Sequence, residues 1–160
     1  EAVLNSLKEY SPEVLNTKAA VYIYKENHEK AIELLQTNTE LPEARYNLAL
    51  LKAQERDLQE AYRLIKEYKD VNAAVIALSV GETEHAAHIM EQCHDNTPVA
   101  EYVRALIAAR TGQKAVAVAE HLKQVLTDSR VKTRMETEPD FLPYHTSPEF
   151  QALIGGKENE

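Results

Sequence analysis

The clearest structural signal in this chain is the run Pro42-Glu-Ala-Arg-Tyr-Asn-Leu-Ala49-Leu-Leu-Lys52, followed after a polar turn by Asp57-Leu-Gln-Glu-Ala61-Tyr-Arg-Leu-Ile65. In both runs apolar residues recur three and four positions apart, which is the spacing of one face of an α-helix. The turn between them is short, as between two antiparallel helices that pack side by side. Ala49 in the first helix and Ala61 in the second are small enough to let the helices approach closely. The stretch therefore predicts an antiparallel helix pair.

This helix pair belongs to a series of four. An alanine recurs in the first helix and in the second helix of each pair, at spacings of 30, 25 and 31 residues from one pair to the next. The first pair has Ala19 and Ala31, and the pairs after the quoted one have Ala74 and Ala86, then Ala105 and Ala117. We expect helix pairs over residues 12–38, 42–69, 71–95 and 97–127. Local signals mark two of the boundaries, because Gly81 is typical of a helix C-terminus and Thr97 followed by Pro98 is typical of a helix start.

Different elements are expected at the two ends of the series. Residues 1–10 carry Val3, Leu4 and Leu7 and predict an amphipathic helix, which is either a separate element or the second half of an earlier, truncated unit. Residues 128–154 predict a C-terminal cap of short helices, two of which start at Pro139 and Pro148. The apolar anchors of this cap are Phe141, Leu142, Phe150, Leu153 and Ile154. Residues 1–154 are thus expected to form one domain, and the polar residues 155–160 a disordered tail.

Composition excludes several classes of protein. The 160 residues are 44% apolar and 28% charged, which is too apolar for a disordered acidic tail. With 18 basic and 26 acidic residues the net charge is −8, which disfavours nucleic-acid binding. Only 4 residues are glycine, so helices are favoured and a phosphate-binding loop is not expected. No apolar run is long enough for membrane insertion, and the single Cys93 excludes a Cys-rich zinc site.

The repeated residues resemble those of the tetratricopeptide repeat (TPR) family over residues 12–126. The matches are Ala19, Tyr22 and Ala31, then Asn47-Leu48-Ala49 and Ala61, and finally Gly112 and Ala117. The end of the chain, Asp140-Phe141 and Ser147–Leu153, is similar to the end of many bacterial arrays of this family. The chain departs from the family pattern in its shorter spacings, and in having Glu26 and Arg56 where the family has a glycine before the second helix.

The resemblance implies a right-handed superhelix of helix pairs, with a concave groove that binds a peptide or protein segment. The residues that match groove-facing positions are Asn16, Ala20 and Tyr24, then Tyr46, Leu50 and Gln54, and then Tyr102, Leu106 and Arg110. Tyr24, Tyr46 and Tyr102 would be the anchors, because a tyrosine offers a rigid apolar face with a polar tip. The alternative is that these tyrosines only fill contacts between helices. Asn47 matches one position of the family's carboxylate clamp, but the matching lysines are absent and this clamp is not expected.

A few residues could support other chemistry. His85 and His88 lie three residues apart on one expected helix and could hold a transition metal, although Cys93 lies about 140° around the helix from His88 at roughly 100° per residue. No nucleophile has a convincing base or oxyanion hole. We therefore expect no enzyme and no cofactor. A cluster of basic residues precedes the expected cap. It could dock an acidic partner, or its charges could simply keep one face of a short helix in contact with water. The cluster consists of Lys123, Arg130, Lys132 and Arg134.

The sequence as a whole predicts a protein–protein interaction module. The partner is expected to be a protein or peptide, and the module a monomer or weak dimer within a larger bacterial protein. The chain begins at Glu1 without a methionine, so it is expected to be a processed or excised piece. The compartment is unknown, with the bacterial envelope or periplasm favoured over the cytoplasm. The alternatives are a spacer or self-association element without a peptide ligand and, more remotely, the metal-binding domain using His85 and His88.

Overall fold

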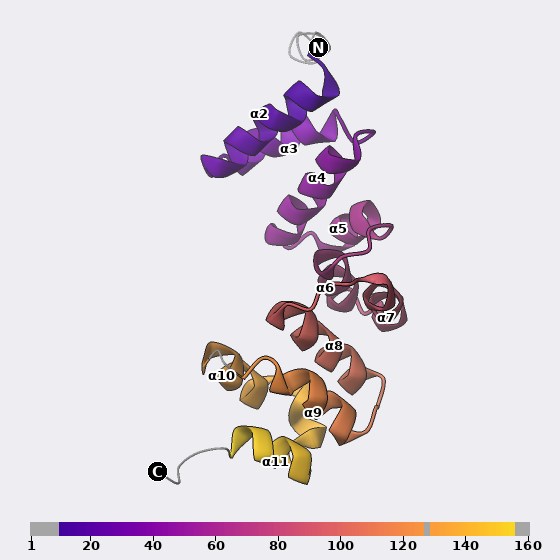
Figure 1. The fold of residues 1–160 in the computed structure, drawn as a ribbon. Coiled ribbons are helices and arrows are strands. Elements are labelled where there is room, and N and C mark those ends of the chain that lie inside the picture. Colours follow the sequence, from indigo (N-terminus) through magenta and orange to yellow (C-terminus); the bar gives the residue numbers. More distant parts are fainter. Residues whose placement is uncertain (1–9, 127–128, 156–160) are drawn as a thin grey trace. The chain divides into compact units, whose positions relative to one another are not determined.

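A computed structural model describes residues 10–126 and 129–155, and the side chains of 129–132 are outside this description. Every regular element in the described residues is a helix, which confirms the all-α class (Figure 1). The elements are α2 (Pro12–Tyr24), α3 (His28–Gln36), α4 (Pro42–Gln54), α5 (Leu58–Ile65), α6 (Val71–Ser79), α7 (Thr83–Gln92), α8 (Pro98–Arg110), α9 (Ala115–Lys123), α10 (Ser129–Thr137), the 3-10 helix η1 (Pro139–Tyr144) and α11 (Pro148–Ile154). The helix was expected over residues 1–10 and the tail over 155–160, and residues 1–9 and 156–160 of these segments lie outside the described residues.

The helices pack in consecutive pairs, namely α2 with α3, α4 with α5, α6 with α7, and α8 with α9. Side-chain caps begin several of them, because Ser11, Asp70, Thr97 and Ser147 each accept a hydrogen bond from a backbone N–H in the first turn. The helix start predicted at Thr97 and Pro98 is confirmed. The second helix of the fourth pair begins at Ala115, two residues later than Gln113, where the sequence pattern placed it.

The turn inside each pair has the same backbone geometry four times. One residue of each turn lies in the left-handed region: Glu26 at φ 56°, Arg56 at 66°, Gly81 at 87° and Gly112 at 69°. The next amide donates to a carbonyl five residues earlier, as from Asn27 to Tyr22 and from Asp57 to Lys52, both at 2.9 Å. These bonds form the Schellman motif, which normally uses glycine at the left-handed position. The turns therefore repeat at the spacings of the small residues, but only the third and fourth carry the favoured glycine.

The small residues lie where the helices of each pair meet. Seven of the eight predicted positions have no exposed surface: Ala19, Ala31, Ala49, Ala61, Ala74, Ala86 and Ala105. The eighth, Ala117, is only half-buried, and its neighbours Val118 and Ala119 are buried instead. Close packing of helices at small side chains is thus confirmed for the first three pairs and for α8.

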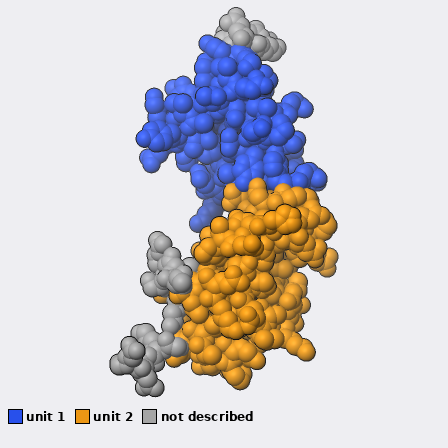
Figure 2. Space-filling model, viewed as in Figure 1, with its two compact units in different colours: residues 1–68 blue, residues 69–160 orange. Residues whose placement is uncertain are grey.

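The helices fall into two compact units, residues 1–68 and residues 69–160 (Figure 2). The first contains α2 to α5, and the second contains α6 to α11. The single domain expected over residues 1–154 stays a prediction, because an array of repeats is itself a series of locally packed units.

The C-terminal elements cover the last helix pair of the second unit. η1 packs on α8 and α11 packs on α9. The predicted anchors Phe141, Phe150 and Leu153 are buried there, and the two phenylalanine rings lie 6.1 Å apart. Leu142 was also expected to be an anchor, but it is 55% exposed because the tight 3-10 turn directs it away from the core that holds Phe141.

No helix among the described residues is long and apolar enough to cross a bilayer. This agrees with the expectation that the chain does not insert into a membrane by a helix.

Candidate functional site

The first unit has a surface pocket of about 470 Å³ between its two first helices, α2 and α4. Its lining residues are Asn16 from α2, Pro42, Glu43, Tyr46 and Asn47 from α4, and Tyr68 after the end of α5. This volume is within the range of about 300–1,000 Å³ that small-molecule sites occupy. Two predicted groove residues, Asn16 and Tyr46, are therefore brought together in one pocket.

Two side-chain amides that line this pocket are joined by a hydrogen bond. Asn47 Nδ2 donates to Asn16 Oδ1 at 3.1 Å, and both residues are half-buried. Each amide has one acceptor oxygen and two donor hydrogens, so the bond leaves the Asn16 NH2 group and the Asn47 oxygen unused. Within the described residues no further hydrogen bond satisfies these groups. They remain available to a ligand that carries both a donor and an acceptor.

An aromatic pair forms the wall of the pocket. The Tyr46 and Tyr68 rings are 5.0 Å apart and inclined by 56°. The Tyr68 hydroxyl donates to the Pro42 carbonyl, and the Arg45 guanidinium lies 5.9 Å from the Tyr68 ring. These contacts hold the aromatic surface in a fixed orientation, which lowers the entropy lost when a ligand binds against it.

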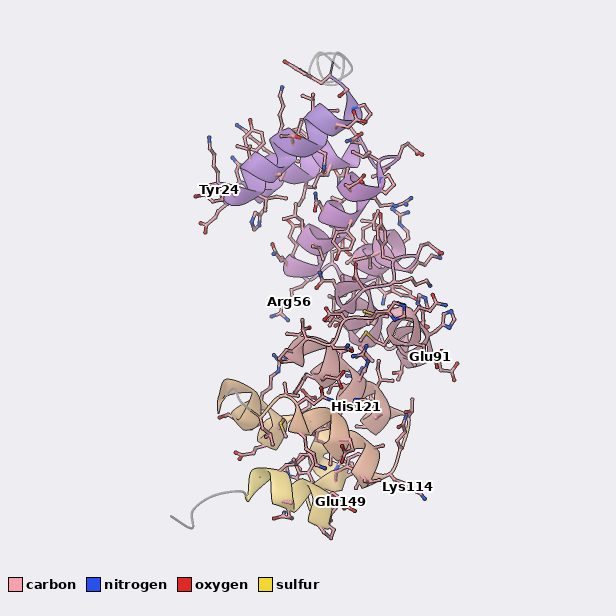
Figure 3. The ribbon with its side chains drawn as sticks, in the orientation of Figure 1. Tyr24, Arg56, Glu91, Lys114, His121 and Glu149 are labelled. Atoms are coloured by element: carbon pink, nitrogen blue, oxygen red, sulfur yellow. The ribbon has the colours of Figure 1, made fainter. Side chains whose placement is uncertain are left out.

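The other predicted groove residues of the first unit do not line this pocket. Leu50 is half-buried on α4, while Ala20 and Gln54 are exposed. Tyr24 is 89% exposed and projects from the C-terminal end of α2 (Figure 3). Tyr24 and Gln54 therefore lie on open surface rather than in a recess.

Tyr68 is the pocket residue that the sequence analysis did not identify. Its hydroxyl reaches the carbonyl of Pro42, which lies 26 residues earlier. In the first pair Asn38 Nδ2 donates to the Pro12 carbonyl at 2.7 Å, across the same separation of 26 residues. Comparing the ends of the second helices between repeats, rather than only their first helices, would have pointed to Tyr68.

In the second unit, two predicted groove residues pack into the core instead. Tyr102 and Leu106 lie against the buried cluster that contains Phe141 and Phe150. The Tyr102 ring meets Phe141 edge-on at 5.8 Å, and burial together with the nearby Glu138 carboxylate raises the pKa of Tyr102 to about 12. For Tyr102 the structure favours the alternative that the sequence left open, in which the tyrosine fills a contact between helices.

Arg110, the third predicted groove residue of this unit, is held by the protein's own groups. Its Nε donates to Asp140 Oδ2 at 2.7 Å, and a terminal nitrogen donates to the Leu78 carbonyl at 2.8 Å. Because Leu78 is in α6 and Asp140 is in η1, Arg110 fastens both elements to α8. The predicted contact of Arg110 with a partner stays a prediction.

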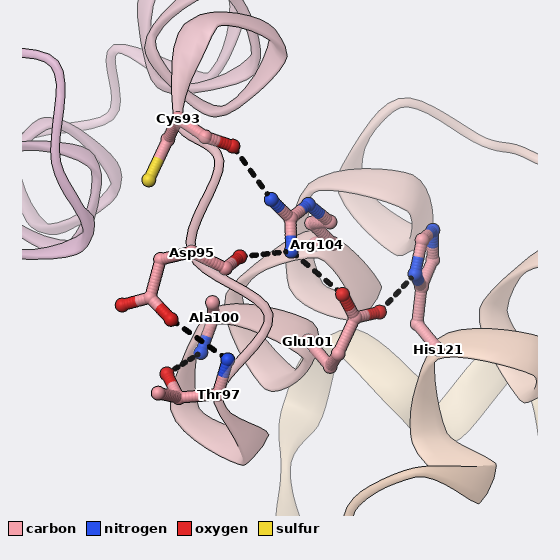
Figure 4. Close-up of polar contacts among 7 residues, drawn as sticks. All are labelled: Cys93, Asp95, Thr97, Ala100, Glu101, Arg104 and His121. Carbon is pink, nitrogen blue, oxygen red and sulfur yellow. Dashed lines mark hydrogen bonds and ion pairs between the residues drawn. The ribbon is translucent and has the colours of Figure 1, made fainter.

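A second feature of this unit is a buried polar network that the sequence analysis missed (Figure 4). Glu101 is 6% exposed, and its two carboxylate oxygens lie 2.6 Å from an Arg104 nitrogen and 2.8 Å from His121 Nδ1. Burial alone would raise the pKa of Glu101, but hydrogen bonds from His121 and Arg104 outweigh it and hold the pKa below its usual value. Arg104 also donates to the carbonyls of Cys93 at 2.9 Å and Asp95 at 2.8 Å.

The network ties three segments of the second unit together. Arg104 anchors the linker after α7 to α8, and Glu101 connects α8 to His121 on α9. A pocket of about 220 Å³ lies beside it, lined by Ala87, Met90, Glu91, Arg104, Ile107, Ala108, Gln113 and His121. The Arg104 and His121 side chains of this lining are both hydrogen-bonded to Glu101. The sequence signal was weak, since the spacing of Glu101 and Arg104 indicates an ordinary surface ion pair and does not reveal the contact with His121.

The remaining candidates have local partners. His88 Nε2 lies 3.1 Å from the Gln92 side-chain amide, and the described residues contain no group of three or more His, Cys, Asp or Glu placed to hold a metal. Of the predicted basic cluster, Lys123 pairs with Glu120 and the Arg134 guanidinium lies 5.8 Å from the Tyr102 ring. The side chains of Arg130 and Lys132 lie outside the described residues.

Comparison of the chain with protein-family models, with curated proteins and with solved structures found no match.

Proposed function

We infer that this chain is a protein-interaction module built from TPR-like helix pairs, and that the pocket between α2 and α4 binds a peptide segment. One observation carries this proposal. Two successive first helices each present an asparagine to the same pocket, and the two amides are joined at 3.1 Å beside the Tyr46–Tyr68 pair.

The unused amide groups suit a peptide backbone. A peptide unit offers one N–H and one C=O, which complement the Asn47 oxygen and the Asn16 NH2 group. An apolar side chain of the same segment would lie on the Tyr46 face, where an aromatic contact contributes about 0.5–1.5 kcal/mol beyond its buried area. Glu43 at the pocket and the net charge of −8 favour a neutral or basic segment over an acidic one.

The other parts of the proposal are expectations from the sequence analysis. The right-handed superhelix and the bacterial origin belong to the proposal as expectations of the TPR resemblance, and the non-enzymatic role as an expectation from the sequence motifs. The spacer alternative is favoured by a specific feature of the second unit, where Arg110 and the Glu101 network occupy the polar groups that a peptide would otherwise use. On this account the first unit binds the peptide and the second unit acts as a spacer.

The test is a selection of binding peptides followed by matched variants. Peptides enriched from a displayed random library on the tag-free protein would be measured by fluorescence anisotropy. Asn47→Ala is expected to weaken binding about 10-fold, since a lost hydrogen bond in a desolvated pocket costs about 1–1.5 kcal/mol. Tyr46→Ala is expected to weaken it at least as much. Tyr24→Ala is the control, because Tyr24 is an exposed tyrosine outside the pocket.

Two results would contradict the proposal. The first is that no peptide is enriched. The second is that the Asn47 and Tyr46 variants, with helical circular dichroism unchanged, bind the selected peptide as tightly as the Tyr24 variant does.

A further inference from the structure

The pocket between α2 and α4 has a single charged group among its described lining residues, the carboxylate of Glu43. The Glu43 side chain is exposed, and no other described residue forms a hydrogen bond or an ion pair with it. A carboxylate without an internal partner attracts a positive charge to its binding site and repels a negative one. The charge of the group that binds next to Glu43 is therefore restricted.

Glu43 lies on the same face of α4 as the other two side chains that this helix turns toward the pocket. Tyr46 follows Glu43 by three residues and Asn47 follows it by four, and side chains with these separations are neighbours on a helix. At 1.5 Å per residue, Asn47 is about 6 Å along the helix from Glu43. An amide, an aromatic ring and a carboxylate thus follow one another toward the N-terminus of α4.

The aromatic wall of the pocket suits a guanidinium group. The Arg45 guanidinium already lies 5.9 Å from the centre of the Tyr68 ring, within the range of about 6 Å for a cation–π contact. An arginine side chain combines an aliphatic stem, which packs on apolar surface, with a planar head that binds a carboxylate. The stem of such a side chain would supply the apolar contact with Tyr46, and its head would reach Glu43.

Resting on the proposed function, we propose that the peptide bound in this pocket carries an arginine, whose side chain lies along Tyr46 and pairs with Glu43. The peptide backbone is held at Asn47, so the arginine side chain extends along α4 toward its N-terminus. Arginine fits better than lysine, because a guanidinium forms two parallel hydrogen bonds with a carboxylate and stacks on an aromatic ring. An acidic side chain at this position would be repelled by Glu43 and by the net charge of −8.

Glu43 also stabilises its own helix, and this effect has a matched control elsewhere in the chain. Glu43 lies in the first turn of α4, where a negative charge interacts favourably with the helix dipole. Glu149 has the same place in α11, directly after a proline, and it is exposed and belongs to the other unit. Glu43→Gln and Glu149→Gln therefore make the same change in net charge and in a helix first turn, but only Glu43→Gln alters the pocket.

Peptide selection on two forms of the protein tests the preference for arginine. Peptides from a displayed random library are selected on the tag-free parent and, separately, on Glu43→Gln. Arginine is expected to be enriched at one fixed peptide position on the parent and not on the variant. The enriched peptide is then synthesised in two labelled forms, one with that arginine and one with citrulline, which has nearly the same shape but no charge.

Fluorescence anisotropy compares the two peptides on each protein. Glu43→Gln is expected to weaken binding of the arginine peptide about 3-fold to 5-fold, as for an ion pair in contact with solvent. The citrulline peptide should bind Glu43→Gln as tightly as it binds the parent, since it has no charge to lose a partner. Glu149→Gln is expected to leave the affinity of both peptides nearly unchanged.

The possible failures of this inference and of the proposed function differ. Selected peptides that require Asn47 and Tyr46 but have no arginine at a fixed position would overturn the inference and leave the proposed function standing. Equal losses for the arginine and citrulline peptides on Glu43→Gln, or equal losses on Glu43→Gln and Glu149→Gln, would do the same. Peptide binding that is unaffected by Asn47→Ala and Tyr46→Ala would contradict both.

Discussion

Replacing Glu26 by glycine is expected to stabilise the protein, even though the substitution removes a side chain. Glu26 has φ 56°, a left-handed conformation that brings its Cβ close to the following carbonyl. That conformation costs an ordinary residue about 1–2 kcal/mol, and glycine adopts it without this penalty. Glycine in turn loses about 0.5–1 kcal/mol more conformational freedom on folding. The difference leaves a net gain of about 0–1.5 kcal/mol for Glu26→Gly, centred on about 0.8 kcal/mol.

The same turn geometry provides matched comparisons within the chain. Arg56→Gly has the same cause and is expected to give a similar gain, because Arg56 has φ 66° and is exposed. Gly112→Ala is the reverse change and is expected to destabilise by about 1 kcal/mol. A Cβ added at Gly112 would meet no atom within 4 Å, so this loss is the backbone strain less the conformational freedom that alanine removes from the unfolded chain. Glu26→Ala keeps the Cβ and separates the backbone effect from removal of the charge.

Urea unfolding measures these changes through the midpoint of the transition at an unchanged m-value. The two gains are expected to add, since Glu26 and Arg56 lie in separate turns without shared partners. A lower midpoint for Glu26→Gly than for Glu26→Ala would refute the reasoning, as would a higher midpoint for Gly112→Ala than for the parent.

Three further predictions concern stability. Arg110→Met removes the bonds to Asp140 and Leu78 and is expected to destabilise by about 1–3 kcal/mol in urea unfolding, whereas Arg63→Met, which breaks an exposed ion pair with Glu60, should change the free energy of unfolding by under about 1 kcal/mol. Ser147→Ala removes the cap of α11 and is expected to lower stability by about 1 kcal/mol, while Ser147→Asp should restore it. The pKa of Glu101 is lowered in the folded state, so its stabilising contribution is present above the unfolded pKa and is lost as pH falls through the folded pKa. Between about pH 7 and pH 3 the free energy of unfolding should therefore fall less steeply for Glu101→Gln than for the parent, as measured by urea unfolding at each pH.

Most of the helices could be predicted because their signals are local. Thr97 and Pro98 start α8, and Gly81 adopts the left-handed turn that ends α6, as their residue types indicate. The turns at Glu26 and Arg56 carried no glycine signal, and only the spacing of the repeats placed them. Leu142 was assigned to the core because it is apolar, whereas its exposure depends on the pitch of a 3-10 turn that residue type does not specify.

The candidate site was predicted less completely, because helical spacing identifies a face but not what covers it. Tyr46 and Tyr102 were equivalent by that argument, yet Tyr46 lines a pocket and Tyr102 lies against the C-terminal elements. Arg110 is engaged by groups 30 and 32 residues away, and neither helical periodicity nor the repeat of small residues shows which side chains meet across that separation. The same reason explains why the contact between Glu101 and His121, 20 residues apart, was missed.

The central claim is that the Asn16–Asn47 amide pair binds a peptide backbone, and the side-chain amide resonances report on it most directly. In a nitrogen-15 NMR titration with a selected peptide, the NH2 signals of Asn16 and Asn47 are expected to shift with the same saturation curve. The NH2 signal of Gln92, which lies on α7 in the other unit, should stay in place. A peptide that saturates the protein while the Asn16 and Asn47 signals do not move would contradict the account.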